Sequence, residues 1–156
     1  MNTKREPVTI AVTGSFASGK STFVKMLGEL GAETVSSDEL VHELLSDDAE
    51  TIRRVVERFG HEILGETGVD RKALGGKVFG EPEALKDLED MLHPLVRRET
   101  DRRMAGSKSQ IFVAEIPLLF EGTRSAAFDY TVAVLPPEER RKLWAGERGV
   151  GEERLR

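Results

Sequence analysis

The 156-residue sequence contains no cysteine, one tryptophan and one tyrosine. The absence of cysteine excludes disulfide bonds and thiolate metal sites, which favours a cytoplasmic location. The opening residues MNTKREPVTI lack the apolar core of a signal peptide, and no hydrophobic run approaches the length of a membrane span. We therefore expect a cytoplasmic protein with no membrane partner.

Basic residues are the minority among the charged ones, since 23 Lys and Arg stand against 28 Asp and Glu, for a net charge of −5. Binding along a nucleic-acid backbone needs a net basic face, so nucleic acid is not expected as a main partner. The net charge does not exclude an anionic small ligand that binds in a local basic pocket. Hydrophobic residues amount to 38% and occur along the whole length, which predicts one domain over residues 1–156.

Short apolar runs alternate with helical spacings along the chain. The runs predict strands at 8–13, 33–36, 111–116 and 130–135. Apolar residues at helical spacing predict helices over 21–30, from Asp38 onward, over 52–59, 71–78 and 82–92, from Pro94 toward Met104, and after Pro136. Strands separated by helices favour an α/β fold with a parallel sheet flanked by helices. The stretch 38–107 is too long for a single crossover, so we interpret it as a helical insertion.

The segment GSFASGKST lies between the first predicted strand and the first predicted helix. Its Gly14, Gly19, Lys20 and Ser21 match the pattern G-x-x-x-x-G-K-[ST] in the strand–loop–helix context that the pattern requires. In such a loop, backbone amides and the helix N-terminus surround phosphates, the lysine neutralises their charge and the serine can ligate Mg²⁺. The alternative is a plain glycine-rich turn. We therefore expect this loop to bind a nucleoside triphosphate. The expected contacts are Gly14, Ala17, Ser18, Gly19, Lys20, Ser21 and Thr22.

Two carboxylates follow predicted strands. Asp38 comes at the carboxyl end of the second strand, where ligands bind in open α/β sheets. It can accept the proton of an acceptor hydroxyl that attacks the γ-phosphorus, or it can simply cap its helix. Glu115 ends the third strand, where an acid can hold Mg²⁺ through water or can be an ordinary strand-end charge.

Six segments in series resemble the dephospho-coenzyme A kinase family over about residues 8–137. They are GSFASGKST, GAETVSSDELVHELL, FGHEIL, GVDRKAL, LHPLV and PLLFE. The resemblance implies a P-loop kinase fold whose helical insertion, 38–107, binds the acceptor and whose lid starts at 136–156. It implies transfer of the γ-phosphoryl of ATP, with Mg²⁺, to the ribose 3′-hydroxyl of dephospho-coenzyme A, the last step of coenzyme A synthesis.

The resemblance also assigns roles to single residues. Asp38 matches the second Asp of an Asp-Ala-Asp motif, which favours its role as the base. His93 can equally be a helix-boundary residue, and the apolar residues of PLLFE can be ordinary core. A row of arginines at 97, 98, 102 and 103 suits a solvated surface or the acceptor's diphosphate. The implied acceptor contacts are Asp38, Arg71, His93, Pro117, Leu118, Leu119 and Glu121.

The sequence departs from the family pattern at two places. Ser36 stands where the first Asp of Asp-Ala-Asp is expected. In the lid, Leu143 and Glu147 occupy the places of two phosphate-clamping arginines, so we expect the nearby Arg141 to supply the catalytic cation. We expect an incomplete lid at Arg156, with an uncovered sheet edge that predicts a monomer or a weak homo-oligomer. Another small-molecule P-loop kinase, or a nucleotide-binding protein without turnover, are the alternatives.

Overall fold

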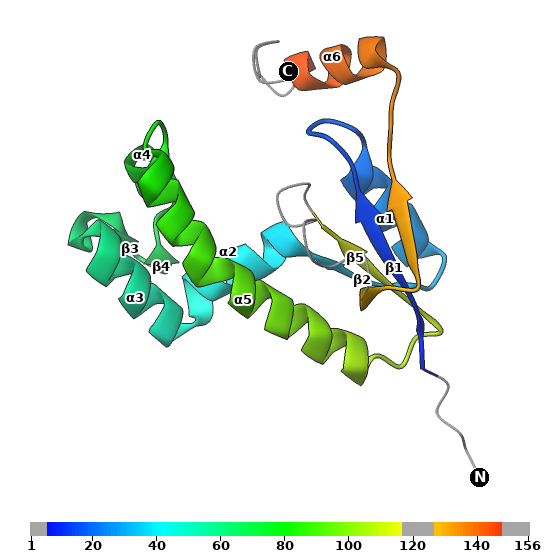
Figure 1. Ribbon diagram of the computed structural model, residues 1–156, viewed down its shortest axis with the longest axis horizontal. Coiled ribbons are helices and arrows are strands. Elements are labelled where there is room, and N and C mark those ends of the chain that lie inside the picture. The colour runs from blue at the N-terminus through cyan, green and yellow to red at the C-terminus, as the bar shows by residue number, and fades with distance from the viewer. Residues whose placement is uncertain (1–5, 117–126, 148–156) are drawn as a thin grey trace. The chain divides into compact units, whose positions relative to one another are not determined.

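The computed structural model describes residues 6–116 and 127–147, and the chain divides into two compact units (Figure 1). Residues Met1–Ser36 and Arg103–Arg156 form the first, here called the sheet unit. Residues Ser37–Arg102 form the second, here called the helical unit. Each unit has its own hydrophobic core.

The sheet unit contains a four-stranded parallel sheet in the order β2-β5-β1-β6. The strands are β1 (Val8–Thr13), β2 (Glu33–Ser36), β5 (Ile111–Glu115) and β6 (Tyr130–Ala133). The predicted α/β fold with a parallel sheet is confirmed, although β5 and β6 end one and two residues earlier than predicted. Val12 of β1 and Ser36 of β2 both lie opposite Glu115 of β5. This register brings the carboxyl ends of three strands together.

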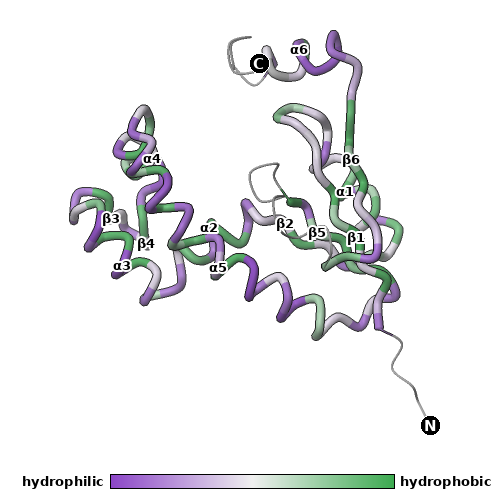
Figure 2. The backbone as a smooth tube through the Cα atoms, viewed as in Figure 1, coloured by the Kyte–Doolittle hydropathy of each residue, from purple (hydrophilic) through white to green (hydrophobic). Residues whose placement is uncertain are grey.

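Helix α1 (Lys20–Glu29) packs against this sheet. Its Val24 forms a core with Val12 of β1 and Val113 of β5, and Figure 2 shows hydrophobic residues concentrated along the strands. A buried strand needs apolar residues on both faces, which explains the continuous apolar runs of β1 and β5. The last described helix, α6 (Glu138–Glu147), also belongs to the sheet unit and follows two prolines.

The helical unit packs its helices around a second core. Its elements are α2 (Ser37–Asp47), α3 (Ala49–Phe59), a 3₁₀ helix (His61–Ile63), the strands β3 (Leu64–Gly65) and β4 (Gly68–Val69), α4 (Arg71–Val78) and most of α5 (Pro82–Gly106). Asp48 caps α3 by accepting the amide proton of Thr51, and Asp70 caps α4. These caps satisfy amides that have no acceptor within their helices.

Three local features differ from what the sequence led us to expect. We predicted separate helices before and after Pro94, but α5 continues through it. Proline removes one amide donor from the helix, yet Leu92 and Val96 are buried on either side of it, and this packing holds the adjoining turns. The β3–β4 hairpin was not predicted, because its strands are too short to show alternation. Asp38 is not the helix cap, because α2 already begins at Ser37.

Candidate active site

The loop between β1 and α1, residues 14–19, is here called the phosphate loop. A Cβ atom on Gly14 would lie 2.5 Å from the carbonyl oxygen of Val134 and 2.7 Å from Ser18 Oγ, so no larger residue fits. Gly19 takes a left-handed conformation, with φ of 88°, and stands as the N-cap of α1 without a side-chain cap. The amides of the first helical turn therefore have no acceptor within the helix. They form the anion-binding end of α1.

Lys20 folds back over the phosphate loop. Its Nζ donates hydrogen bonds to the carbonyl oxygens of Gly14, at 2.8 Å, and Ser15, at 3.1 Å. Both of these acceptors are neutral carbonyl groups, so neither cancels the ammonium charge at the mouth of the loop. The half-buried position strengthens that charge, because less water screens it.

Ser21 and Glu115 come together across the sheet edge. Ser21 Oγ donates a 2.9 Å hydrogen bond to Glu115 Oε1. The parallel register places Glu115 beside the end of β1, and the loop then returns the chain so that Ser21 stands in the first turn of α1. A hydroxyl and a carboxylate are hard oxygen donors of the kind that Mg²⁺ prefers. The two residues predicted to hold the metal are therefore neighbours.

Two buried hydroxyl groups at this end of the sheet have no hydrogen-bond partner among the described residues. They are Thr13 Oγ1, at the end of β1, and Ser18 Oγ, inside the phosphate loop. A buried hydroxyl without a partner costs about 1–3 kcal/mol. Ser18 Oγ can therefore donate a hydrogen bond to an acceptor group that enters the loop. Our sequence reasoning did not single out Thr13, because nothing in a strand-end threonine signals an unsatisfied hydroxyl.

Helix α6 contributes a cation to the phosphate loop. Arg141 Nη1 donates a 3.4 Å hydrogen bond to Ser15 Oγ, and the two residues are 126 positions apart in the sequence. The guanidinium group predicted as the lid cation therefore lies beside the predicted phosphate site. Sequence reasoning missed Ser15, which the loop pattern allows to be any residue.

The predicted acceptor residues belong to other places in the fold. Asp38 is exposed in the first turn of α2, two residues after Ser36 of β2. Arg71 begins α4 and is exposed, and His93 is half-buried within α5. All three lie in the helical unit. The remaining predicted contacts, Pro117, Leu118, Leu119 and Glu121, lie outside the described residues.

Comparison with known proteins decides the family. A family model described as dephospho-CoA kinase matches residues 8–153. The chain belongs to the dephospho-CoA kinase family. A dephospho-CoA kinase of Protochlamydia amoebophila is 38% identical over 135 residues, which are 83% of this chain and 66% of the relative. Another, of Bdellovibrio bacteriovorus, is 40% identical over 139 residues, which are 85% and 68% of the two chains. The chain thus spans about two thirds of the length of these curated dephospho-CoA kinases.

Solved structures give the same result. A crystal structure of a Thermus thermophilus protein superimposes with a TM-score of 0.77 and 33% identity, over 97% of this chain and 78% of that one. A dephospho-CoA kinase from Campylobacter jejuni superimposes with a TM-score of 0.66 and 32% identity, over 93% and 75%. Both the predicted family and the predicted P-loop kinase fold are confirmed. The register places Ser36, where we expected a departure from the family's Asp-Ala-Asp motif, directly opposite Glu115.

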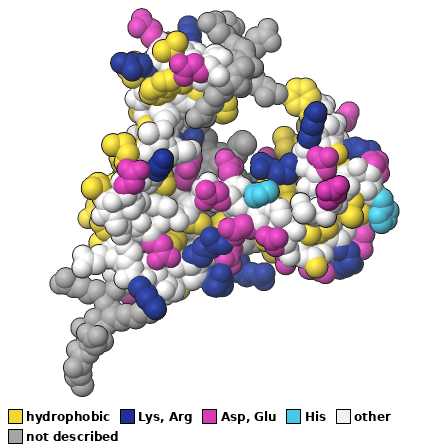
Figure 3. Space-filling view, turned by 180° about the vertical axis from the view of Figure 1, so that it is seen from behind, with side chains coloured by type: hydrophobic (Ala, Val, Ile, Leu, Met, Phe, Trp, Pro, Cys, Tyr) yellow, Lys and Arg dark blue, Asp and Glu magenta, His cyan; other side chains and the backbone are white. Residues whose placement is uncertain are grey.

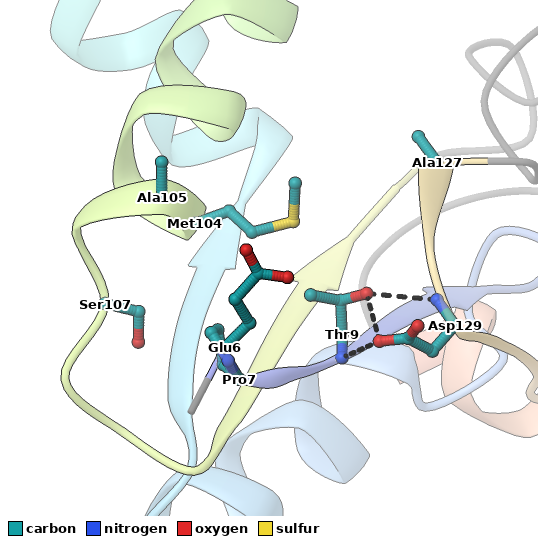
Figure 4. A pocket seen from close by; sticks show the side chains of 8 residues that line it. All are labelled: Glu6, Pro7, Thr9, Met104, Ala105, Ser107, Ala127 and Asp129. Atoms are coloured by element: carbon teal, nitrogen blue, oxygen red, sulfur yellow. Dashed lines mark hydrogen bonds between the residues drawn. The ribbon is translucent and has the colours of Figure 1, made fainter. Parts of the chain in front are cut away.

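A pocket of about 420 Å³ lies at the opposite end of the sheet (Figure 4). It is formed around Thr9, near the start of β1, and Asp129, just before β6. Asp129 Oδ2 accepts hydrogen bonds from the amide and the hydroxyl of Thr9, and these hold the pKa of Asp129 below its ordinary value. With Glu6 as a second carboxylate in its lining, this pocket repels a triphosphate. The phosphate loop, rather than this pocket, is therefore the candidate nucleotide site.

Two arginines of α5, Arg98 and Arg102, lie beside carboxylates. A pocket of about 280 Å³ in the helical unit has Arg98 in its lining together with four carboxylates. Arg102 is paired with Glu99, whose hydrogen bond raises the pKa of the Arg102 guanidinium. Figure 3 likewise shows acidic and basic side chains interspersed over this unit. This arrangement favours the solvated-surface interpretation over a diphosphate site. The carboxylates of the pocket are Glu43, Asp47, Asp48 and Glu99.

Proposed function

We propose that this chain transfers the γ-phosphoryl group of ATP to the ribose 3′-hydroxyl of dephospho-coenzyme A, giving coenzyme A and ADP. The observation that carries the proposal is the contact between Ser21 and Glu115 at the mouth of the phosphate loop, beside Lys20, in a chain of this family. The same three groups are what phosphoryl transfer needs, namely a cation, a metal ligand and a carboxylate that holds the metal's shell.

The residues present fit ATP and Mg²⁺. Gly14 allows the start of the loop to pack closely against the carbonyl oxygen of Val134, and Ser18 Oγ is buried in the loop without a partner among the described residues. Lys20 neutralises phosphate charge. Ser21 would hold Mg²⁺ directly and Glu115 through water. The metal, when bound, supplies positive charge to the phosphate oxygens.

The remaining roles concern the acceptor and the transition state. We assign the role of general base to Asp38. Its carboxylate would accept the proton of the attacking 3′-hydroxyl, as a carboxylate within hydrogen-bond reach can do. Arg141 stabilises the charge that develops on the transferring phosphoryl group, and its contact with Ser15 supports this role. The acceptor would be held by the helical unit and by residues 117–121. We also infer that the protein acts in the cytoplasm, as a monomer or a weak homo-oligomer.

Turnover of ATP with dephospho-coenzyme A by the full chain tests the proposal. ADP release in a coupled assay should depend on dephospho-coenzyme A and should not occur with other nucleoside or sugar acceptors. Lys20→Ala should abolish turnover, whereas Lys25→Ala, an exposed lysine on the same helix, should leave it unchanged. Turnover with a different acceptor only would identify another small-molecule kinase.

The base role of Asp38 needs its own pair of variants. Asp38→Asn should remove transfer while ATP binding persists, because the amide cannot accept the proton but keeps the shape. Glu39→Gln is the matched control, since Glu39 is the next residue and equally exposed. Normal turnover by Asp38→Asn would show that the base is another group.

One observation favours a second candidate, a nucleotide-binding protein without turnover. Ser36 lies opposite Glu115, so a carboxylate expected at this edge is replaced by a hydroxyl. Binding of ATP by calorimetry, together with no ADP release at any Mg²⁺ concentration, would support this alternative. Restoration of turnover by Ser36→Asp would then locate the defect at this position.

A further inference from the structure

Helix α6 contacts both ends of the phosphate loop through one face. Arg141 Nη1 lies 3.4 Å from Ser15 Oγ, near the start of the loop. Trp144 Cζ3 lies 3.6 Å from the position that a Cβ atom on Gly19 would take, at the end of the loop. Residues three apart in a helix share a face, so these two side chains approach the loop together.

Trp144 supplies the apolar part of this contact. It is the only tryptophan in the sequence and is half-buried, whereas its neighbour Leu143 is 59% exposed. The charged residues Glu138 and Lys142 pair with each other along the helix. The hydrogen bond from Arg141 to Ser15 is long, and a bond of that length is weak. The ring of Trp144 adds to the contact between α6 and the loop, because a large aromatic ring buries much apolar area.

We propose that Trp144 is a positioning residue, which seats α6 on the phosphate loop and so holds the Arg141 guanidinium where a bound triphosphate needs a cation. The proposal rests on the proposed function in so far as Arg141 acts on ATP. An arginine side chain has several rotatable bonds, so its charge stays at the loop only if its backbone is held there. Gly19 allows the ring to come close, since it presents no side chain of its own.

A double-mutant cycle tests this role. We expect Trp144→Ala to lower kcat for ATP about 10- to 100-fold, since a small displacement of a catalytic group has an effect of this size. Trp144→Phe should keep kcat within about threefold, because a smaller ring still covers Gly19. Leu143→Ala is the matched control on the same helix and should behave as the unchanged protein. Melting temperatures of all variants should agree closely, because Trp144 lies on a peripheral helix.

The decisive comparison is with Arg141→Ala. If Trp144 acts through Arg141, the double variant should lose no more activity than Arg141→Ala alone, since coupled residues are non-additive. Losses that multiply, or a Trp144→Ala variant with unchanged kcat, would overturn the proposal.

Nucleotide binding separates this proposal from the proposed function. ATP should change the fluorescence of the unchanged protein, whose single tryptophan lies beside the loop. If ATP binds but dephospho-coenzyme A is not phosphorylated, the proposed function fails. In that case the ATP dissociation constants of Trp144→Ala, Arg141→Ala and the double variant, measured by calorimetry, decide the role of Trp144. The double variant should then bind ATP no more weakly than Arg141→Ala alone. A chain that binds no ATP would overturn both proposals.

Discussion

Ser21 and Glu115 are 94 positions apart in the sequence, and the hydroxyl of the first donates a 2.9 Å hydrogen bond to Oε1 of the second. Parallel strands make this possible, because β1 and β5 end side by side and α1 starts just beyond them. Two segments that are distant in the sequence therefore place a hydroxyl and a carboxylate side by side at the carboxyl end of the sheet.

The Mg²⁺ dependence of turnover should show the contribution of the Glu115 charge to metal binding. We expect Glu115→Gln to raise the Mg²⁺ concentration for half-maximal turnover about 10-fold or more, because groups that support metal ligands affect affinity by that much. The glutamine oxygen can still accept the Ser21 hydrogen bond, so the fold should be unaffected. Glu29→Gln, at the end of α1, serves as the control. A magnesium titration curve for Glu115→Gln that superimposes on the unchanged protein would exclude this role.

Two glycine substitutions should have opposite effects on stability. Gly14→Ala places a Cβ 2.5 Å from the carbonyl oxygen of Val134, a backbone atom that cannot move aside, so it should lower the melting temperature and abolish ATP binding. Gly76→Ala, within α4, meets nothing within 4 Å and should stabilise the protein by about 0.5–1 kcal/mol, since alanine favours helix. Thermal unfolding of both variants checks the prediction. Equal destabilisation by both would contradict the close approach at Gly14.

A matched pair of buried threonines separates a satisfied hydroxyl from an unsatisfied one. Thr13 Oγ1 has no partner among the described residues, so Thr13→Val should leave the free energy of unfolding unchanged or raise it. Thr51 donates its hydroxyl proton to Asp48, so Thr51→Val should lower the free energy of unfolding by about 1 kcal/mol. Urea denaturation measures both. A clear loss of stability in Thr13→Val would mean that this hydroxyl has a partner in solution.

Acid should weaken the start of α3. The hydroxyl and then the amide of Thr51 donate to Asp48, and these bonds hold its pKa below the ordinary 3.8. A lowered pKa stabilises the fold above about pH 4, and this contribution is lost as the pH falls through the folded-state pKa. Asp48→Ala should cost about 1 kcal/mol at neutral pH, the usual value for a lost helix cap, and less in acid.

Asp48→Asn is the control for this pH dependence. Asparagine caps helices about as well as aspartate but does not titrate, so stability at neutral pH should be nearly retained. Unfolding measured between pH 7 and 2.5 should show a smaller loss of stability for Asp48→Asn than for the unchanged protein. If both proteins lose the same stability between pH 7 and 2.5, a group other than Asp48 causes the acid sensitivity.

Local signals predicted much of the fold correctly. The four strands of the sheet were predicted within two residues, because each combines β-branched residues with a clear stop. The phosphate loop was predicted from spacing alone, because its chemistry needs glycine, lysine and a hydroxyl at set intervals. Interactions between neighbouring residues are enough for both features.

Features that depend on distant contacts were not predictable. Pro94 predicted a helix boundary, yet buried residues before and after it keep α5 continuous. The hairpin of β3 and β4 is held by its surroundings, since a Cβ on Gly68 would meet the backbone of Leu45 and Ser46 in α2. Trp144 was not predicted as a loop contact, because no local pattern links it to Gly19.

By itself, the sequence determined the strands, the phosphate loop and the family, since these depend on residue types at short spacing. Only the tertiary structure decided that Glu115 meets Ser21 and that Arg141 and Trp144 approach Ser15 and Gly19. The physical reason is that such contacts follow from strand register and helix packing, which are the sum of many weak interactions between segments far apart in the chain.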